Sequence, residues 1–180
     1  MTNNNSIEIG NFRTRLEYDN VEDIAIVART YFESKGLRKR EIKICVEHTL
    51  RIAKEYKGGV ITTIVYDRNK IISVCLSIKH PTLKIRLLNL LFTKKSYRGI
   101  GLGSGLILFI KGISEENENN VFGVEVDPDE YYQVLPFYKR FGLNKSIEGL
   151  LESNLLVVAE SDIDTIMNEA EKSEYYEKAA

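Results

Sequence analysis

The stretch from Leu87 to Ile113 constrains the fold more than any other part of this chain. It begins with an apolar run of strand length, residues 87–93, and continues through a loop in which Gly99, Gly101 and Gly103 alternate with other residues. Apolar residues at helical spacing follow. The stretch therefore predicts a buried strand, a glycine turn and a helix. Such a turn can hold phosphate or pyrophosphate on its backbone N–H groups and the helix start, although glycine turns also occur for packing alone.

The loop fits the pattern R-x-x-G-x-G through Arg98, Gly101 and Gly103. It contains neither the G-x-G-x-x-G nor the G-x-x-x-x-G-K-[ST] phosphate motif. Together with the preceding strand, it resembles the cofactor loop of the GNAT superfamily, the acetyl-CoA-dependent N-acyltransferases. The resemblance implies acetyl-CoA as co-substrate, with its pyrophosphate on the loop and its pantetheine arm on the strand end. The cofactor contacts that it implies are Leu91, Phe92, Thr93, Arg98, Gly99, Ile100, Gly101, Leu102, Gly103 and Ser104.

A second segment, residues 137–143, reads FYKRFGL and resembles the aromatic-Tyr-x-x-x-Gly-apolar segment of the same family. The resemblance implies that Tyr138 protonates the departing CoA thiolate. Taken without the family, a tyrosine in this position is more often a core residue of an amphipathic helix than a catalyst. The two motifs, with a strand between them, match jointly and favour the catalytic role.

An amine must lose a proton before it can attack a thioester, and a carboxylate can take that proton. Glu125, on the predicted strand VFGVEV, is the first candidate for this base. Asp127 is the second, and a water molecule is the third possibility. A surface glutamate on an alternating strand is the structural alternative for Glu125.

The remaining pattern predicts an α/β chain with a central twisted mixed sheet and helices on both faces, the GNAT-like acyl-CoA N-acyltransferase fold. We expect the strands at residues 85–93 and 121–126 to be parallel neighbours, because a helix separates them. The other expected strands lie at residues 12–17, 60–66, 71–78, 147–151 and 154–159. The expected helices lie at residues 21–32, 40–56, 102–113, 129–141 and 161–180. Ile163, Ile166, Met167 and Ala170 form the apolar stripe of the last helix.

Length and composition indicate one domain over residues 1–180, which the resemblance implies is GNAT-like, with residues 1–10 flexible and residues 161–180 as a helical tail. The chain has 180 residues, 43% hydrophobic and 28% charged, and a net charge of −1, so nucleic acid is not expected as a partner. Its two cysteines and two histidines give no disulfide framework and no metal site. No membrane segment or signal peptide is recognisable, which predicts a cytoplasmic protein.

The predicted activity is transfer of an acetyl group from acetyl-CoA to a primary amine, by direct attack in a ternary complex. The alternative is a catalytically silent acyl-CoA sensor or interaction module with the same fold. The amine acceptor, a small molecule or a protein amine, is left open by the sequence. The oligomeric state is also open, with a homodimer among the alternatives.

Overall fold

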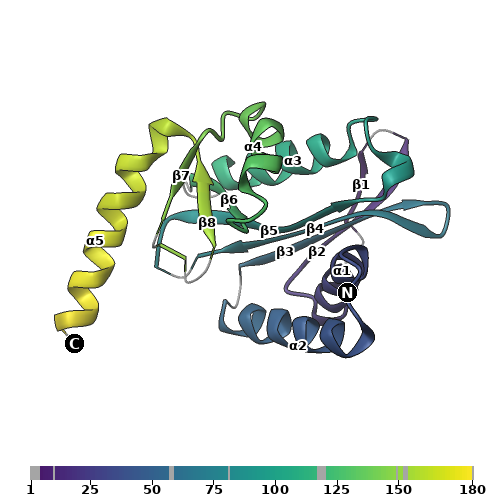
Figure 1. The fold of residues 1–180 in the computed structure, drawn as a ribbon, viewed down its shortest axis with the longest axis horizontal. Coiled ribbons are helices and arrows are strands. Elements are labelled where there is room, and N and C mark those ends of the chain that lie inside the picture. The colour runs from purple at the N-terminus through teal and green to yellow at the C-terminus, as the bar shows by residue number, and fades with distance from the viewer. Residues whose placement is uncertain are drawn as a thin grey trace. The chain divides into compact units, whose positions relative to one another are not determined.

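The computed structural model describes residues 5–9, 11–56, 59–80, 82–116, 121–148, 150–151 and 154–179 (Figure 1). The chain divides into two compact units. The first comprises Met1–Ile78 and Leu90–Ile110, and the second comprises Lys79–Asn89 and Lys111–Ala180.

The strands are β1 (Asn5–Ile9), β2 (Phe12–Tyr18), β3 (Val60–Asp67), β4 (Lys70–Lys79), β5 (Ile85–Thr93), β6 (Val121–Val126), β7 (Lys145–Ile147) and β8 (Leu155–Val158). The α-helices are α1 (Val21–Ser34), α2 (Lys39–Glu55), α3 (Leu102–Glu116), α4 (Tyr131–Lys139) and α5 (Ile163–Ala179). Two short 3-10 helices are η1 (Lys95–Tyr97) and η2 (Glu160–Asp162).

In the first unit, β1, β2, β3 and β4 are joined in this order by antiparallel pairing. The expected strands at residues 60–66 and 71–78 are confirmed as β3 and β4, which pair as an antiparallel hairpin. The apolar stripes of α1 and α2 pack on the sheet, and Figure 1 shows both helices on the same side of these strands. Their shared core consists of Ile24, Val27, Ala28, Val46, Ala53, Val60, Ile64, Val74, Leu76, Ile78 and Leu90.

β1 falls within residues 1–10, where no strand was expected from the sequence. Residues Asn5–Ile9 pair antiparallel with β2, from Asn5↔Leu16 to Ile9↔Phe12. The strand is short and follows a polar start, so backbone pairing with β2 defines it more than its sequence does.

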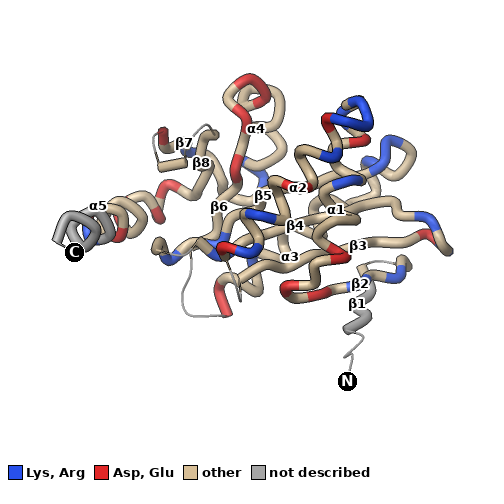
Figure 2. The backbone as a smooth tube through the Cα atoms, turned by 90° about the horizontal axis from the view of Figure 1, so that it is seen from below, with Lys and Arg blue, Asp and Glu red and all other residues tan. Residues whose placement is uncertain are grey.

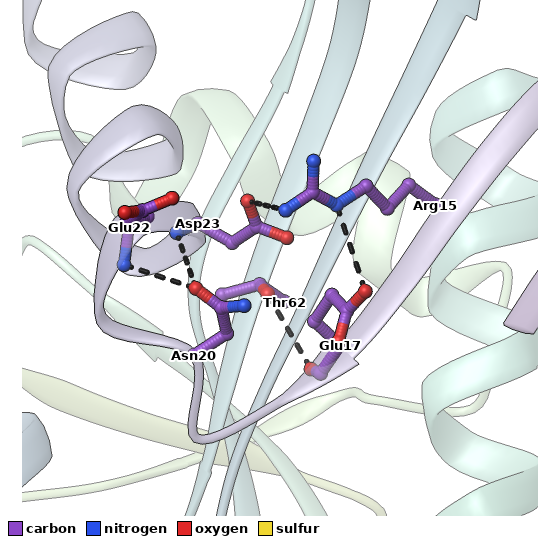
Figure 3. Close-up of polar contacts among 6 residues, drawn as sticks. All are labelled: Arg15, Glu17, Asn20, Glu22, Asp23 and Thr62. Carbon is purple, nitrogen blue, oxygen red and sulfur yellow. Dashed lines mark hydrogen bonds and ion pairs between the residues drawn. The ribbon is translucent and has the colours of Figure 1, made fainter. Parts of the chain in front are cut away.

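The start of α1 is fixed by its cap and by an ion pair between the buried Asp23 and the partly exposed Arg15, shown in Figure 3. The Asn20 side chain accepts hydrogen bonds from the N–H groups of Glu22 and Asp23, as an N-cap residue should. Asp23 in turn accepts a 2.5 Å hydrogen bond from Arg15 on β2, although only 1% of the Asp23 side chain is exposed. Burial raises the pKa of Asp23 above its ordinary value of 3.8, against the opposing attraction of Arg15. This carboxylate therefore ties α1 to β2 at a cost in desolvation.

The raised pKa predicts how stability depends on pH. Because the folded protein holds the Asp23 proton more tightly than the unfolded chain does, this proton stabilises the fold fully below pH 3.8. The stabilisation is lost as the pH rises through the folded-state pKa. Asp23→Asn should flatten that fall in the free energy of unfolding, measured by urea denaturation across this pH range. Glu22→Gln, at an exposed neighbour, should retain it; an identical fall in Asp23→Asn would contradict the assignment.

In the second unit, the strand order is β5-β6-β8-β7. β5 and β6 are parallel, as predicted, whereas β8 is antiparallel to both β6 and β7. α5 packs against this sheet through Ile163, Ile166 and Ala170, but Met167, predicted in the same stripe, is 40% exposed. A Cβ at Gly123 would come within 2.7 Å of Leu156 Cδ1, so this strand position requires glycine for close packing.

Two predicted boundaries shift in this unit. α4 begins at Tyr131 rather than Asp129, because Asp129 lies in a turn in which its N–H donates to Asp127 Oδ1. β7 covers Lys145–Ile147 rather than residues 147–151, since its polar first residues pair with β8 at the sheet edge. In the part of the chain that the structure describes, no helix has the length and apolar character needed to cross a bilayer.

Candidate functional site

The loop after β5 has the predicted strand–turn–helix geometry. Thr93 ends β5, η1 follows, and α3 begins at Leu102. Gly99 and Gly101 have φ angles of 83° and 91°, in the left-handed region that side chains disfavour. A Cβ built at either glycine meets nothing within 4 Å. The two glycines are therefore required by backbone conformation, and the side of the loop toward which a side chain would project is open.

The start of α3 turns backbone N–H groups toward this loop. The Gly105 N–H donates to the Gly101 carbonyl over 2.8 Å, which is the first hydrogen bond of the helix. The N–H groups that precede it in a helix have no intrahelical acceptor and lie at the positive end of the helix dipole. An anionic group is the natural partner for such an arrangement.

Three basic side chains, Lys94, Lys95 and Arg98, are exposed around the same loop. Arg98 donates from Nε to the Thr93 carbonyl over 3.0 Å, which anchors its guanidinium at the end of β5. Guanidinium has five N–H donors, so this bond leaves the rest of the fork for an anion. Lys94 is held through its backbone, whose N–H donates to the Ile72 carbonyl over 2.8 Å.

Tyr97, in the middle of the loop, ties it to the end of β3. Its hydroxyl donates to Asp67 Oδ2 over 2.5 Å, and its ring makes an edge contact with Phe12. The hydrogen bond to Asp67 raises the pKa of Tyr97 above its ordinary value of 10.0, so the phenol remains a donor at neutral pH. The sequence did not indicate this tether, because Tyr97 and Asp67 lie 30 residues apart.

Tyr97→Phe should weaken CoA binding by about three- to tenfold, the effect of losing one partly exposed hydrogen bond to a carboxylate. The ring contact with Phe12 is retained, so the midpoint of thermal unfolding should change little. Isothermal titration with CoA measures the effect. Tyr66→Phe, on the neighbouring strand, serves as the control and should bind CoA as the parent does. Equal CoA affinity in Tyr97→Phe and its parent would show that the tether does not order the loop.

The end of β5 carries the residues expected to contact pantetheine. Ser73 donates from its hydroxyl to the Phe92 carbonyl over 2.7 Å, and its oxygen lies 2.8 Å from the Thr93 hydroxyl oxygen. The Thr93 carbonyl accepts from Arg98. The backbone at this strand end is thus held in place by side chains from β4 and from the loop, which gives a bound chain a fixed edge to pair with.

Glu125 occupies a half-buried position on β6 in the second unit, between the buried Val124 and Val126. Its two carboxylate oxygens accept hydrogen bonds from different side chains, Asn89 at the end of the ladder on β5 and Asn154 just before β8. Sequence reasoning missed both asparagines. The sequence does contain an indication of Asn89, because it interrupts the apolar run LLNLL of a strand, where asparagine is disfavoured.

Asp127, the second candidate base, differs from Glu125 in its surroundings. It is exposed, and its Oδ1 accepts the Asp129 N–H over 2.9 Å in the turn before α4. Figure 2 shows acidic positions along the chain from β6 into α4. Asp127 thus has a structural role in the turn before α4, whereas the Glu125 carboxylate lies half-buried on β6.

Tyr138 lies on α4 and is 9% exposed. Its carbonyl accepts the N–H groups of Phe141 and Leu143, which closes the helix end. Gly142 has a φ of 82°, as a glycine that reverses the chain after a helix does, and Leu143 is buried behind it. The glycine and apolar positions of the FYKRFGL segment thus have a structural reason, whereas none of these backbone contacts requires the Tyr138 hydroxyl.

No family model and no curated protein sequence matches the chain. Solved structures do. An acetyltransferase of the GNAT family from Staphylococcus aureus aligns with a TM-score of 0.56 and 13% identity over 81% of this chain and 98% of its own. The PaiA N-acetyltransferase of Thermoplasma acidophilum, in complex with coenzyme A, gives the same TM-score, identity and coverages. An aminoglycoside N-acetyltransferase, AAC(6')-Iy, in complex with CoA, aligns with a TM-score of 0.55 and 11% identity over 81% of this chain and 97% of its own.

These alignments confirm the predicted fold class. The chain has the mixed α/β fold of the GNAT acyl-CoA N-acyltransferases.

Proposed function

We propose that this protein transfers an acetyl group from acetyl-CoA to a primary amine. The observation that carries the proposal is the R-x-x-G-x-G turn, which has two left-handed glycines and opens α3 in a chain with the GNAT fold. Two solved structures with this fold are described as complexes with CoA, which supports the same ligand here. The N–H groups at the start of α3 favour a bound anion, and the CoA pyrophosphate is an anion of this kind.

In the proposed complex, the N–H groups of residues 99–104 and the Arg98 guanidinium hold the pyrophosphate. The pantetheine arm pairs with the backbone of Leu91, Phe92 and Thr93. A backbone N–H at Phe92 or Thr93 stabilises the negative charge that develops on the thioester oxygen during attack. These assignments carry over residue by residue from the resemblance of the two motifs.

The proposed reaction forms one C–N bond and breaks one C–S bond. Glu125 takes a proton from the ammonium form of the acceptor, and the freed nitrogen lone pair attacks the thioester carbonyl carbon. The C–S bond breaks, its electron pair stays on sulfur, and Tyr138 donates its phenolic proton to the thiolate, which gives CoA thiol. The second surplus proton of the nitrogen passes through water to the Tyr138 phenolate, and Glu125 returns its proton to solvent, which leaves a neutral N-acetylated product. No acetyl group rests on the protein, because the attack is direct in a ternary complex.

Two measurements on the wild-type protein test the proposal together. CoA should raise the midpoint of thermal unfolding, since a ligand that binds only the folded state stabilises it. Acetyl-CoA should then release free thiol in the presence of one or more members of a panel of primary amines. A thermal shift without thiol release would favour the silent acyl-CoA sensor, and the absence of both would contradict the cofactor assignment.

A further inference from the structure

Glu125 lies where the backbone ladder between β5 and β6 ends. The last ladder pair is Leu88↔Val124, and Asn89 and Glu125 are the next residues on the two strands. On its other side, β6 pairs with β8, and Asn154 immediately precedes β8. Glu125 is therefore flanked by Asn89 of β5 on one side and by Asn154, just before β8, on the other.

Both asparagines donate to the Glu125 carboxylate. Asn89 donates from Nδ2 to Oε2, and Asn154 donates from Nδ2 to Oε1 over 2.6 Å. Because a carboxylate only accepts hydrogen bonds, each amide must present its NH2 group to Glu125 rather than its oxygen. Each carboxylate oxygen has two lone pairs, so one lone pair on each oxygen remains for a proton.

The two bonds fix the plane of the carboxylate. The terminal torsion of a glutamate is otherwise broad, and immobilising such a side chain costs conformational entropy. Because the two donors lie on opposite sides of β6, the carboxylate is already immobilised before any substrate binds.

We infer that Asn89 and Asn154 are the positioning residues of the base, holding Glu125 so that one free lone pair faces the proton of the acceptor ammonium. The inference deepens the proposed function and rests on it. In the step concerned, the proton passes from nitrogen to a Glu125 oxygen, the N–H electron pair stays on nitrogen, and no other bond changes. The asparagines act through Glu125 and contact neither acetyl-CoA nor the amine.

A double-mutant cycle tests this. The variants are Asn89→Ala, Asn154→Ala, Glu125→Gln and the two doubles that combine Glu125→Gln with either alanine. The rate is thiol release from acetyl-CoA with the panel amine that turns over fastest, or hydrolysis of acetyl-CoA where no amine does, because water needs the same base. Each asparagine variant alone should lower kcat by about ten- to a hundredfold, the effect of a misplaced catalytic group. In the Glu125→Gln background, neither should lower it further.

A second readout separates positioning from folding. Raising the pH should partly restore kcat in Asn89→Ala and Asn154→Ala, because the amine is then neutral in solution and needs no base. Asn89→Ser, which keeps a donor, should lie between Asn89→Ala and the wild type. Asn144→Ala is the matched control, since Asn144 accepts the Glu160 N–H in the same unit and has no bond to Glu125 in the described contacts. Its kcat should equal that of the wild type.

Asparagine effects that multiply with Glu125→Gln would overturn the inference while leaving the proposed function intact. Unchanged kcat in both asparagine single variants would overturn it as well. A wild-type protein that neither acetylates an amine nor hydrolyses acetyl-CoA would contradict the proposed function itself, and the inference with it, before any variant is made.

Discussion

Tyr138→Phe should lower kcat by about ten- to ten-thousandfold, the usual range for one general acid. Tyr138 is only 9% exposed and the variant keeps its aromatic ring, so packing on α4 should survive. The KM for acetyl-CoA should change little, because the donated proton matters only as the thiolate forms in the transition state. Steady-state kinetics with a confirmed amine acceptor measures both constants.

The matched control for this variant is Tyr132→Phe, on the same helix. Tyr132 is 84% exposed, so its hydroxyl has no buried role and its loss should leave kcat unchanged. Full kcat in Tyr138→Phe would show that Tyr138 only packs and that solvent protonates the thiolate.

Gly101→Val should abolish CoA binding, as measured by isothermal titration. The Gly101 φ of 91° is strained for any residue with a Cβ, by about 1–2 kcal/mol, and more for a β-branched one. The space around a Cβ at this position is open in the protein, so the valine meets no protein atom within 4 Å of its Cβ. The side chain instead occupies the volume that the proposal assigns to the pyrophosphate.

Gly36→Val is the control for the effect of backbone strain alone. Gly36 follows α1 with a φ of 75°, and its surroundings are equally open, so valine there should cost comparable stability. CoA affinity should stay at the wild-type level in Gly36→Val. Unchanged CoA affinity in a folded Gly101→Val protein would remove the pyrophosphate from this loop.

The strand, loop and helix around Arg98 were predictable because every signal agreed there. The apolar run predicts the strand, the alternating glycines predict the turn, and the helical spacing predicts the helix. The structure contains these three elements in this order, with positive φ at Gly99 and Gly101. The same holds for the hairpin of β3 and β4. Local pattern is sufficient where an element buries one face of its own.

Strands and side chains whose position depends on a neighbouring strand were less predictable from the sequence. β1 is ordered by its pairing with β2, and β7 is a short polar edge strand placed by β8. Asn89 and Asn154 lie 36 and 29 positions from Glu125 in the sequence. Only the folded sheet therefore shows that both side chains contact Glu125. Sequence could nominate Glu125 from its strand, but the side chains that would hold it are a property of the fold.

The most direct test of the central claim follows the acetyl group itself. The wild-type protein is incubated with acetyl-CoA labelled with deuterium in the acetyl methyl group and with the amine panel, and products and intact protein are analysed by mass spectrometry. The proposal predicts the label on the nitrogen of a primary amine, in equal amount to the CoA thiol released, with no label on the protein. Thiol release without a labelled amide, or label retained on the protein, would contradict direct transfer to an amine.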